Sequence, residues 1–157
     1  MEQTVARKSF LFAVRIVKLY KHLNTNKKEY VLSRQLLRSG TSIGANIAEA
    51  EQGQSRADFI SKMNIALKEA VETNYWLRLL QATDYLSEAE FSSIYSDCRE
   101  LEKMLTAIVK TAKHYLSTLH SPLSTEYAGM VELVDTLDLG DVIPVKVFLF
   151  CHPPFWR

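Results

Sequence analysis

Over residues 94–119, apolar residues recur at alternating steps of four and three. That spacing keeps one side of an α-helix apolar over many turns and is typical of helices that pack at shallow angles in a bundle. The segment begins with a capping box, because Ser87 and Glu90 are three residues apart, and Pro122 ends it. The positions of the repeat are Ile94, Cys98, Leu101, Leu105, Ile108, Ala112, Tyr115 and Leu119.

Three earlier segments also have helical periodicity, and strand patterns are nearly absent before residue 122. Their connections are short, about two to six residues, which favours antiparallel neighbours. We therefore expect an all-α fold, an antiparallel up-down-up-down four-helix bundle, in a domain of residues 1–121. The three earlier helices are predicted over residues 8–23, 27–52 and 55–82.

Local signals fix the ends and faces of these three helices. Asn26 and Glu29 are spaced as a capping pair for the second helix, and Ser55 and Asp58 have the same spacing before the third. The third helix is apolar over a wide arc, so we expect it to contact neighbours on more than one side. The apolar face predicted for the first helix consists of Phe10, Ala13, Val14, Val17 and Tyr20.

The second helix contains an unusual run of small residues between Leu36 and Ala50. A glycine inside a helix costs about 1 kcal/mol relative to alanine, so two of them suggest that another helix approaches closely. Glu49 is expected to form an ion pair with Arg38 or with a cation of another subunit. We interpret this side as a packing and assembly surface made of Gly40, Ile43, Gly44, Asn46, Ile47, Ala48 and Glu49.

The net charge of +1 conceals a strong asymmetry along the chain. Residues 1–38 contain nine Lys and Arg against two Glu, a net charge of +7. Such a basic segment can bind nucleic acid, dock on an acidic face of another subunit, or form a solvated helix surface. The candidate nucleic-acid contacts are Arg15, Lys18, Lys21, Lys27, Lys28, Arg34 and Arg38.

The sequence contains no arrangement of residues that favours catalysis or a cofactor. No phosphate-binding loop follows a strand, and no Glu precedes a His by three residues, as a di-iron bundle requires. Cys98 lies on the apolar repeat and is expected to be an inert buried thiol, whereas Cys151-His152 is only a weak zinc signal. Tyr75-Trp76 could stack on bases, but a core or subunit-interface position is favoured. We expect a non-enzymatic protein without cofactors.

Two cysteines define no disulfide framework, and no apolar run reaches the length of about 18 residues that spans a membrane. A cytoplasmic location is the expectation that follows.

The region around the small-residue run resembles a known bacterial family, the 23S rRNA intervening-sequence proteins. The similarity covers about residues 8–120, although Gly40 and Gly44 stand where that family often has Ala, Pro or Ser. It implies a homopentameric four-helix bundle with a basic surface for RNA or DNA and no catalytic activity. The fold is also similar to accessory proteins of diversity-generating retroelements. The residues that carry the resemblance are Arg38, Ser42-Ile43, Asn46-Ile47-Ala48-Glu49, Ser55 and Asp58-Phe59.

Residues 122–157 depart from both the helical pattern and the family. We expect an irregular, non-bundle tail that is disordered or loosely attached. Residues 129–140 resemble the translation of a bacterial leucine tRNA gene, which suggests read-through into an adjacent RNA gene. A protein-interaction or scaffold module without nucleic-acid binding remains the alternative function for the whole chain.

Overall fold

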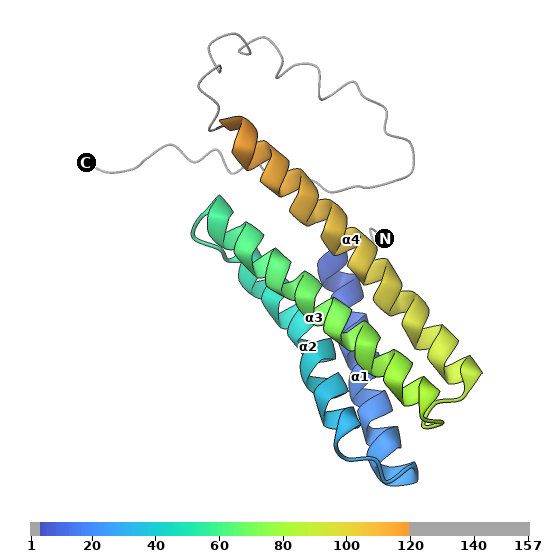
Figure 1. Ribbon diagram of the computed structural model, residues 1–157. Helices are drawn as coiled ribbons and strands as arrows, with labels where there is room; N and C mark the ends of the chain where they lie inside the picture. The colour runs from blue at the N-terminus through green and yellow to red at the C-terminus, as the bar shows by residue number, and fades with distance from the viewer. Residues whose placement is uncertain (1–3, 120–157) are drawn as a thin grey trace.

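The computed structural model describes residues 4–119, and it is all-α over this range, without a strand (Figure 1). The all-α prediction is therefore confirmed. The predicted tail, residues 122–157, lies outside the described residues. The four helices are α1 (Val5–Asn26), α2 (Leu32–Glu51), α3 (Arg56–Ala82) and α4 (Glu88–Leu119).

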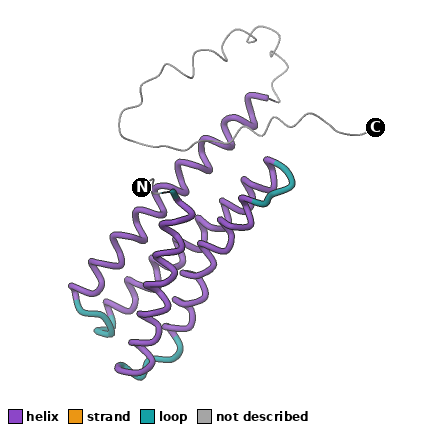
Figure 2. Tube along the Cα trace, turned by 180° about the vertical axis from the view of Figure 1, so that it is seen from behind, coloured by secondary structure: helices purple, strands orange, loops and turns teal. Residues whose placement is uncertain are grey.

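Consecutive helices pack side by side, and α4 returns to lie along α1 (Figures 1 and 2). Three cross-contacts define the antiparallel direction of α1 and α4. Lys8 pairs with Glu100, Arg15 pairs with Asp97, and His22 Nε2 lies 3.6 Å from a carboxylate oxygen of Glu90. Meanwhile α3 contacts both α2 and α4, as its wide apolar arc predicts.

The buried side of α1 differs from the predicted apolar face. Phe12, Ile16 and Leu23 are buried, whereas Phe10 is 69% exposed and Val14 is 37% exposed. The prediction was wrong because α1 carries apolar residues on two sides, and a helical period fits either. The side that faces α2 is the buried one, since Ile16 lies directly against the backbone of Gly40.

The repeat in α4 is buried in its first half. Ile94, Cys98, Leu101 and Leu105 belong to the core, in agreement with the alternating spacing. Further along α4 the repeat is less well buried, because Tyr115 is 53% exposed. The centroid of its ring lies 5.1 Å from the guanidinium carbon of Arg56. This cation–π contact joins the end of α4 to the beginning of α3.

The helix caps predicted at Ser55 and Ser87 are present. Ser55 Oγ accepts a hydrogen bond from the Asp58 backbone N–H at 3.1 Å. At the start of α4, the Glu90 carboxylate accepts from the Ser87 hydroxyl at 2.7 Å and from its backbone N–H at 2.9 Å. These two bonds hold the pKa of Glu90 below its ordinary value, and the bond from the Ser87 hydroxyl has the larger effect.

Candidate nucleic-acid interface

The turn between α1 and α2 is built around Glu29, which is 6% exposed. One carboxylate oxygen accepts the backbone N–H groups of Val31 at 2.9 Å and Leu32 at 2.8 Å, and the other accepts that of Ser33 at 2.6 Å. Helix α2 therefore begins at Leu32, and the predicted start near residue 27 was wrong. The sequence spacing predicted that Glu29 caps this helix, but it predicted Asn26 as its partner. In the structure the carboxylate of Glu29 accepts hydrogen bonds from residues that follow it.

Burial alone would raise the pKa of Glu29, yet the bonds from the backbone of Leu32, Ser33 and Val31 and from the Ser33 hydroxyl hold it below its ordinary value. A carboxylate at a helix N-terminus is also stabilised by the helix dipole. Glu29 is the single acidic residue between positions 18 and 38. Its lowered pKa keeps the carboxylate negatively charged, so it offsets one unit of the positive charge around it.

Six of the seven predicted contact residues are exposed around this hairpin. Two lie on the outer side of α1, two in the turn and two on α2. None of the six has an ion-pair partner within 4.0 Å among residues 4–119. The six residues are Lys18, Lys21, Lys27, Lys28, Arg34 and Arg38.

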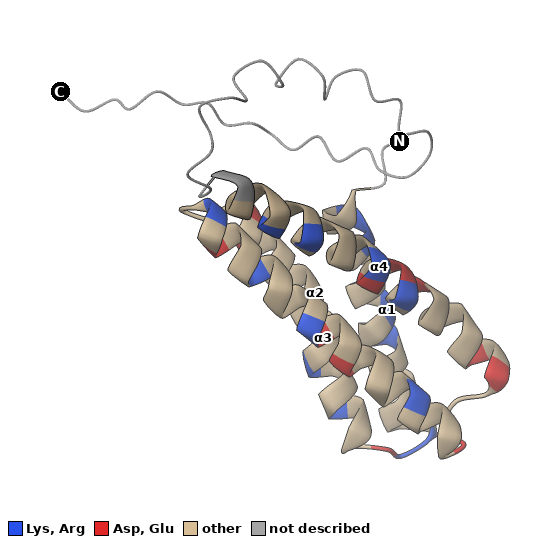
Figure 3. Ribbon diagram, turned by 45° about the horizontal axis from the view of Figure 1, so that its top comes forward, with Lys and Arg blue, Asp and Glu red and all other residues tan. Residues whose placement is uncertain are grey.

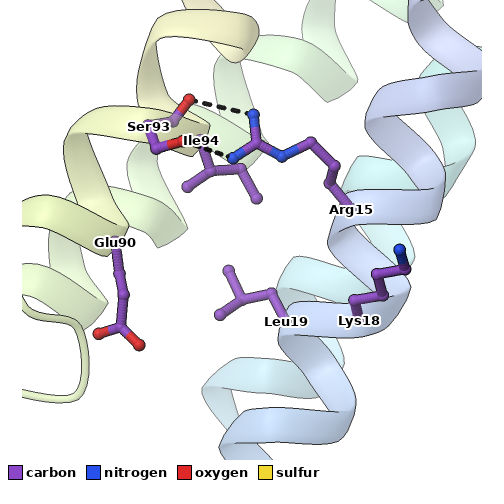
Figure 4. A pocket seen from close by; sticks show the side chains of 6 residues that line it. All are labelled: Arg15, Lys18, Leu19, Glu90, Ser93 and Ile94. Carbon is purple, nitrogen blue, oxygen red and sulfur yellow. Dashed lines mark hydrogen bonds between the residues drawn. The ribbon is translucent and has the colours of Figure 1, made fainter.

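The seventh residue, Arg15, is turned toward α4 instead. Its guanidinium donates to the Ser93 hydroxyl at 2.7 Å and to the Ser93 carbonyl at 3.2 Å (Figure 4). It also forms an ion pair with Asp97. Arg15 and Ser93 line a shallow cavity of about 310 Å³ between α1 and α4, which Lys18 also borders. Arg15 therefore joins two helices rather than contributing to the exposed basic hairpin.

Apart from Glu29 in the α1–α2 turn itself, acidic residues at this end of the bundle lie in the neighbouring turn and at the start of α4 (Figure 3). Asp84, Glu88 and Glu90 are all exposed there. Glu90 lies nearest to α1, through His22. The basic hairpin is thus bordered by acidic groups on two sides, because Glu90 acts electrostatically on Lys27 and Glu69 of α3 acts on Arg38.

The glycines of α2 allow α1 to approach within the same chain. A Cβ atom on Gly40 would lie 2.8 Å and 2.9 Å from the Cγ1 and Cγ2 atoms of Ile16, closer than real Cβ atoms come. One turn on, a Cβ on Gly44 would lie 3.4 Å from Ser9 Oγ, which is an ordinary contact. Ile43 and Ile47 are fully buried beside them.

The remaining predicted assembly residues lie nearer the surface. Ala48 and Glu49 are exposed, and Asn46 donates its side-chain N–H to the Ser42 carbonyl at 2.9 Å. Within the chain Glu49 forms an ion pair with Lys62 of α3 and not with Arg38, while the alternative pair with a cation of another subunit stays a prediction. Glu49 and Lys62 lie on different helices with a turn between them, so the helical spacing of the sequence offered no signal for this pair.

Cys98 and the candidate metal ligands are the remaining features that the sequence offered for chemistry. Burial raises the pKa of the Cys98 thiol to about 12, with Glu102 acting in the same direction, so the thiol stays protonated. Within residues 4–119 no group of three or more His, Cys, Asp or Glu could hold a metal ion. Cys151 and His152 lie outside that range. No helix in the described part is long and apolar enough to cross a membrane.

The fold and the site define a four-helix bundle with a basic hairpin at one end. The family model of the 23S rRNA-intervening sequence protein matches residues 1–107, and the chain belongs to this family. It is similar to a crystal structure of a protein of unknown function from the S23 ribosomal protein family of Bacteroides thetaiotaomicron. The two share 61% identity with a TM-score of 0.68, and the match covers 68% of this chain and 99% of that one. None of the curated proteins matches the chain.

Proposed function

We propose that this protein is a non-enzymatic homo-oligomer that binds RNA or DNA through the basic hairpin of α1 and α2. The observation that carries the proposal is the set of six exposed cations, at Lys18, Lys21, Lys27, Lys28, Arg34 and Arg38, without ion-pair partners among the described residues. Lys and Arg side chains placed on phosphates release condensed counterions, which gives affinity with little sequence preference.

Assembly is supported by the apolar residues on the outer side of α1. Phe10 is 69% exposed, Leu11 53% and Val14 37%, an unusual concentration for one solvent-facing helix. A different exposed apolar pair, Val71 and Tyr75, lies on α3. When two unlike surfaces of one chain meet, the contact repeats head to tail and can close into a ring. The family resemblance implies five copies.

The nucleic-acid proposal is tested with the full-length chain and a labelled RNA hairpin. Changing Lys18, Lys21, Lys27 and Lys28 to Glu should weaken binding and flatten its salt dependence, by about one unit of slope for each phosphate that is no longer neutralised. The matched control changes the same four residues to Arg, which preserves their charge and should preserve binding. If the Glu variant binds the hairpin as the natural chain does, the proposed surface is wrong.

The same Glu variant distinguishes nucleic-acid binding from the competing function, a protein-interaction module that binds no nucleic acid. If the protein is such a module, the cations serve subunit docking. The natural chain would then not bind the RNA hairpin, and charge reversal would break the oligomer. Changing Phe10 and Val14 to Ser tests the assembly surface independently. We expect a smaller particle for that variant, while Val31→Ser, an exposed apolar position before α2, should leave the particle unchanged.

A further inference from the structure

The second half of α4 is a basic surface distinct from the α1–α2 hairpin. From residue 103 to the end of α4 at Leu119 the sequence contains Lys103, Lys110 and Lys113 and no acidic residue. All three lysines are exposed and none has an ion-pair partner within 4.0 Å in the described part of the chain. Blue segments mark this half of α4 in Figure 3.

A shallow groove of about 350 Å³ lies along this surface. One of its cations, Arg99, is held in place, because it pairs with Glu102, which is only 7% exposed. Glu102 in turn accepts a hydrogen bond from the side-chain amide of Asn74 in α3, at 2.8 Å. The guanidinium is therefore anchored to the helix seam. The groove is lined by Arg99, Glu102, Lys103, Thr106, Ala107 and Lys110. Glu102 is the single acidic group in the groove lining, and it is already paired.

We infer that this α4 groove holds the phosphate backbone of the bound nucleic acid, as a second contact surface. The inference rests on the proposed function and adds to it a site that the sequence did not single out. Arg99 and Lys113 are fourteen residues apart, about 21 Å along a helix. A duplex carries one negative charge about every 1.7 Å of its axis, counting both strands, so a row of cations of this length faces several phosphates.

The composition of the groove favours this occupant over a protein partner. Protein interfaces bury an apolar, aromatic-rich core. The groove lining contains Ala107 and no larger apolar side chain, against three cations, of which Lys103 and Lys110 have no ion-pair partner among the described residues and Arg99 is paired with Glu102. Phosphate contacts need the cations and no apolar anchor, so charge complementarity points to a nucleic-acid backbone.

The test compares two double variants of the full-length chain by their binding to a short labelled DNA duplex over a salt titration. One variant is Lys103→Gln with Lys110→Gln, and the other is Lys18→Gln with Lys21→Gln. Each should reduce the slope of log affinity against log salt by about 2, one unit for each lysine. Lys103→Arg with Lys110→Arg is the matched control and should keep the natural slope. Far-UV circular dichroism checks that each variant is folded.

The outcomes separate the two proposals. A reduced slope for both glutamine pairs supports both surfaces. A natural slope for the α4 pair with a reduced slope for the α1 pair overturns the α4 inference and leaves the proposed function standing. A reduced slope for the α4 pair alone supports this inference and overturns the placement of binding on α1. Natural slopes for both pairs overturn both.

Discussion

Replacing Gly40 or Gly44 of α2 by alanine should change the stability of the fold in opposite directions, although the two positions are only one helical turn apart. Gly44→Ala gains the helical preference of alanine, about 0.8–1 kcal/mol, because its Cβ meets Ser9 Oγ at an ordinary 3.4 Å. Gly40→Ala gains the same preference, but its Cβ would lie 2.8 Å from Ile16 Cγ1. Ile16 is fully buried and β-branched, so it cannot easily turn aside. Overpacking of this kind costs about 1–3 kcal/mol.

The helical gain is common to both variants, so their difference isolates the clash. We expect Gly40→Ala to be less stable than Gly44→Ala by about 1–3 kcal/mol. The assay is urea unfolding at one fixed protomer concentration, because assembly would otherwise shift the midpoint. In an Ile16→Ala background the clashing atoms are gone, and the difference should fall within about 0.5 kcal/mol. Equal stabilities of the two alanine variants with Ile16 intact would refute the close approach of α1 and α2.

Three other predictions concern single side chains. Glu29→Gln should destabilise the fold by about 1–3 kcal/mol in urea unfolding, since three backbone N–H groups lose a charged acceptor. Because its folded pKa is lowered, Glu29 stabilises the natural chain above the ordinary value of 4.5, and this contribution is lost as pH falls through the folded pKa; the glutamine variant should lack that acid sensitivity. In a Cys151→Ser chain, Cys98 should react with a thiol reagent at pH 8 far more slowly when native than when unfolded, given a pKa of about 12. Asp97→Asn should cost no more than about 1 kcal/mol, less at high salt, because the side chains of Arg15 and Asp97 are 38% and 40% exposed; a larger cost would show that the pair is shielded from solvent.

The fold class was predictable because apolar spacing and caps act locally. The alternating repeat identified Cys98 and Leu101 as buried, and Ser87 with Glu90 placed the start of α4. The apolar face of α1 was not predictable, because Phe10 and Phe12 lie on different sides and nothing local decides which side meets α2. That choice is made by packing, where Ile16 fits the space that Gly40 leaves.

The candidate site was predictable in composition and less so in arrangement. A count of charges was enough to find the basic hairpin, but it gave no sign that Arg15 is committed to Ser93 and Asp97 across the α1–α4 seam. Pairing between helices depends on which residues share a level, and that depends on where the turns end. The groove on α4 could not be predicted for the same reason, because the hydrogen bond between Asn74 and Glu102 that holds its side chains joins two helices.

The most direct test of the account is the mass of the particle in solution, measured for the full-length chain alone and with an RNA hairpin at low and high salt. The chain has a mass of 18.0 kDa. We predict a particle about five times heavier without RNA, as the family resemblance implies. It should gain the mass of the hairpin at low salt and release it at high salt. A particle of one chain's mass, or an oligomer that leaves the hairpin free at low salt, would contradict the account.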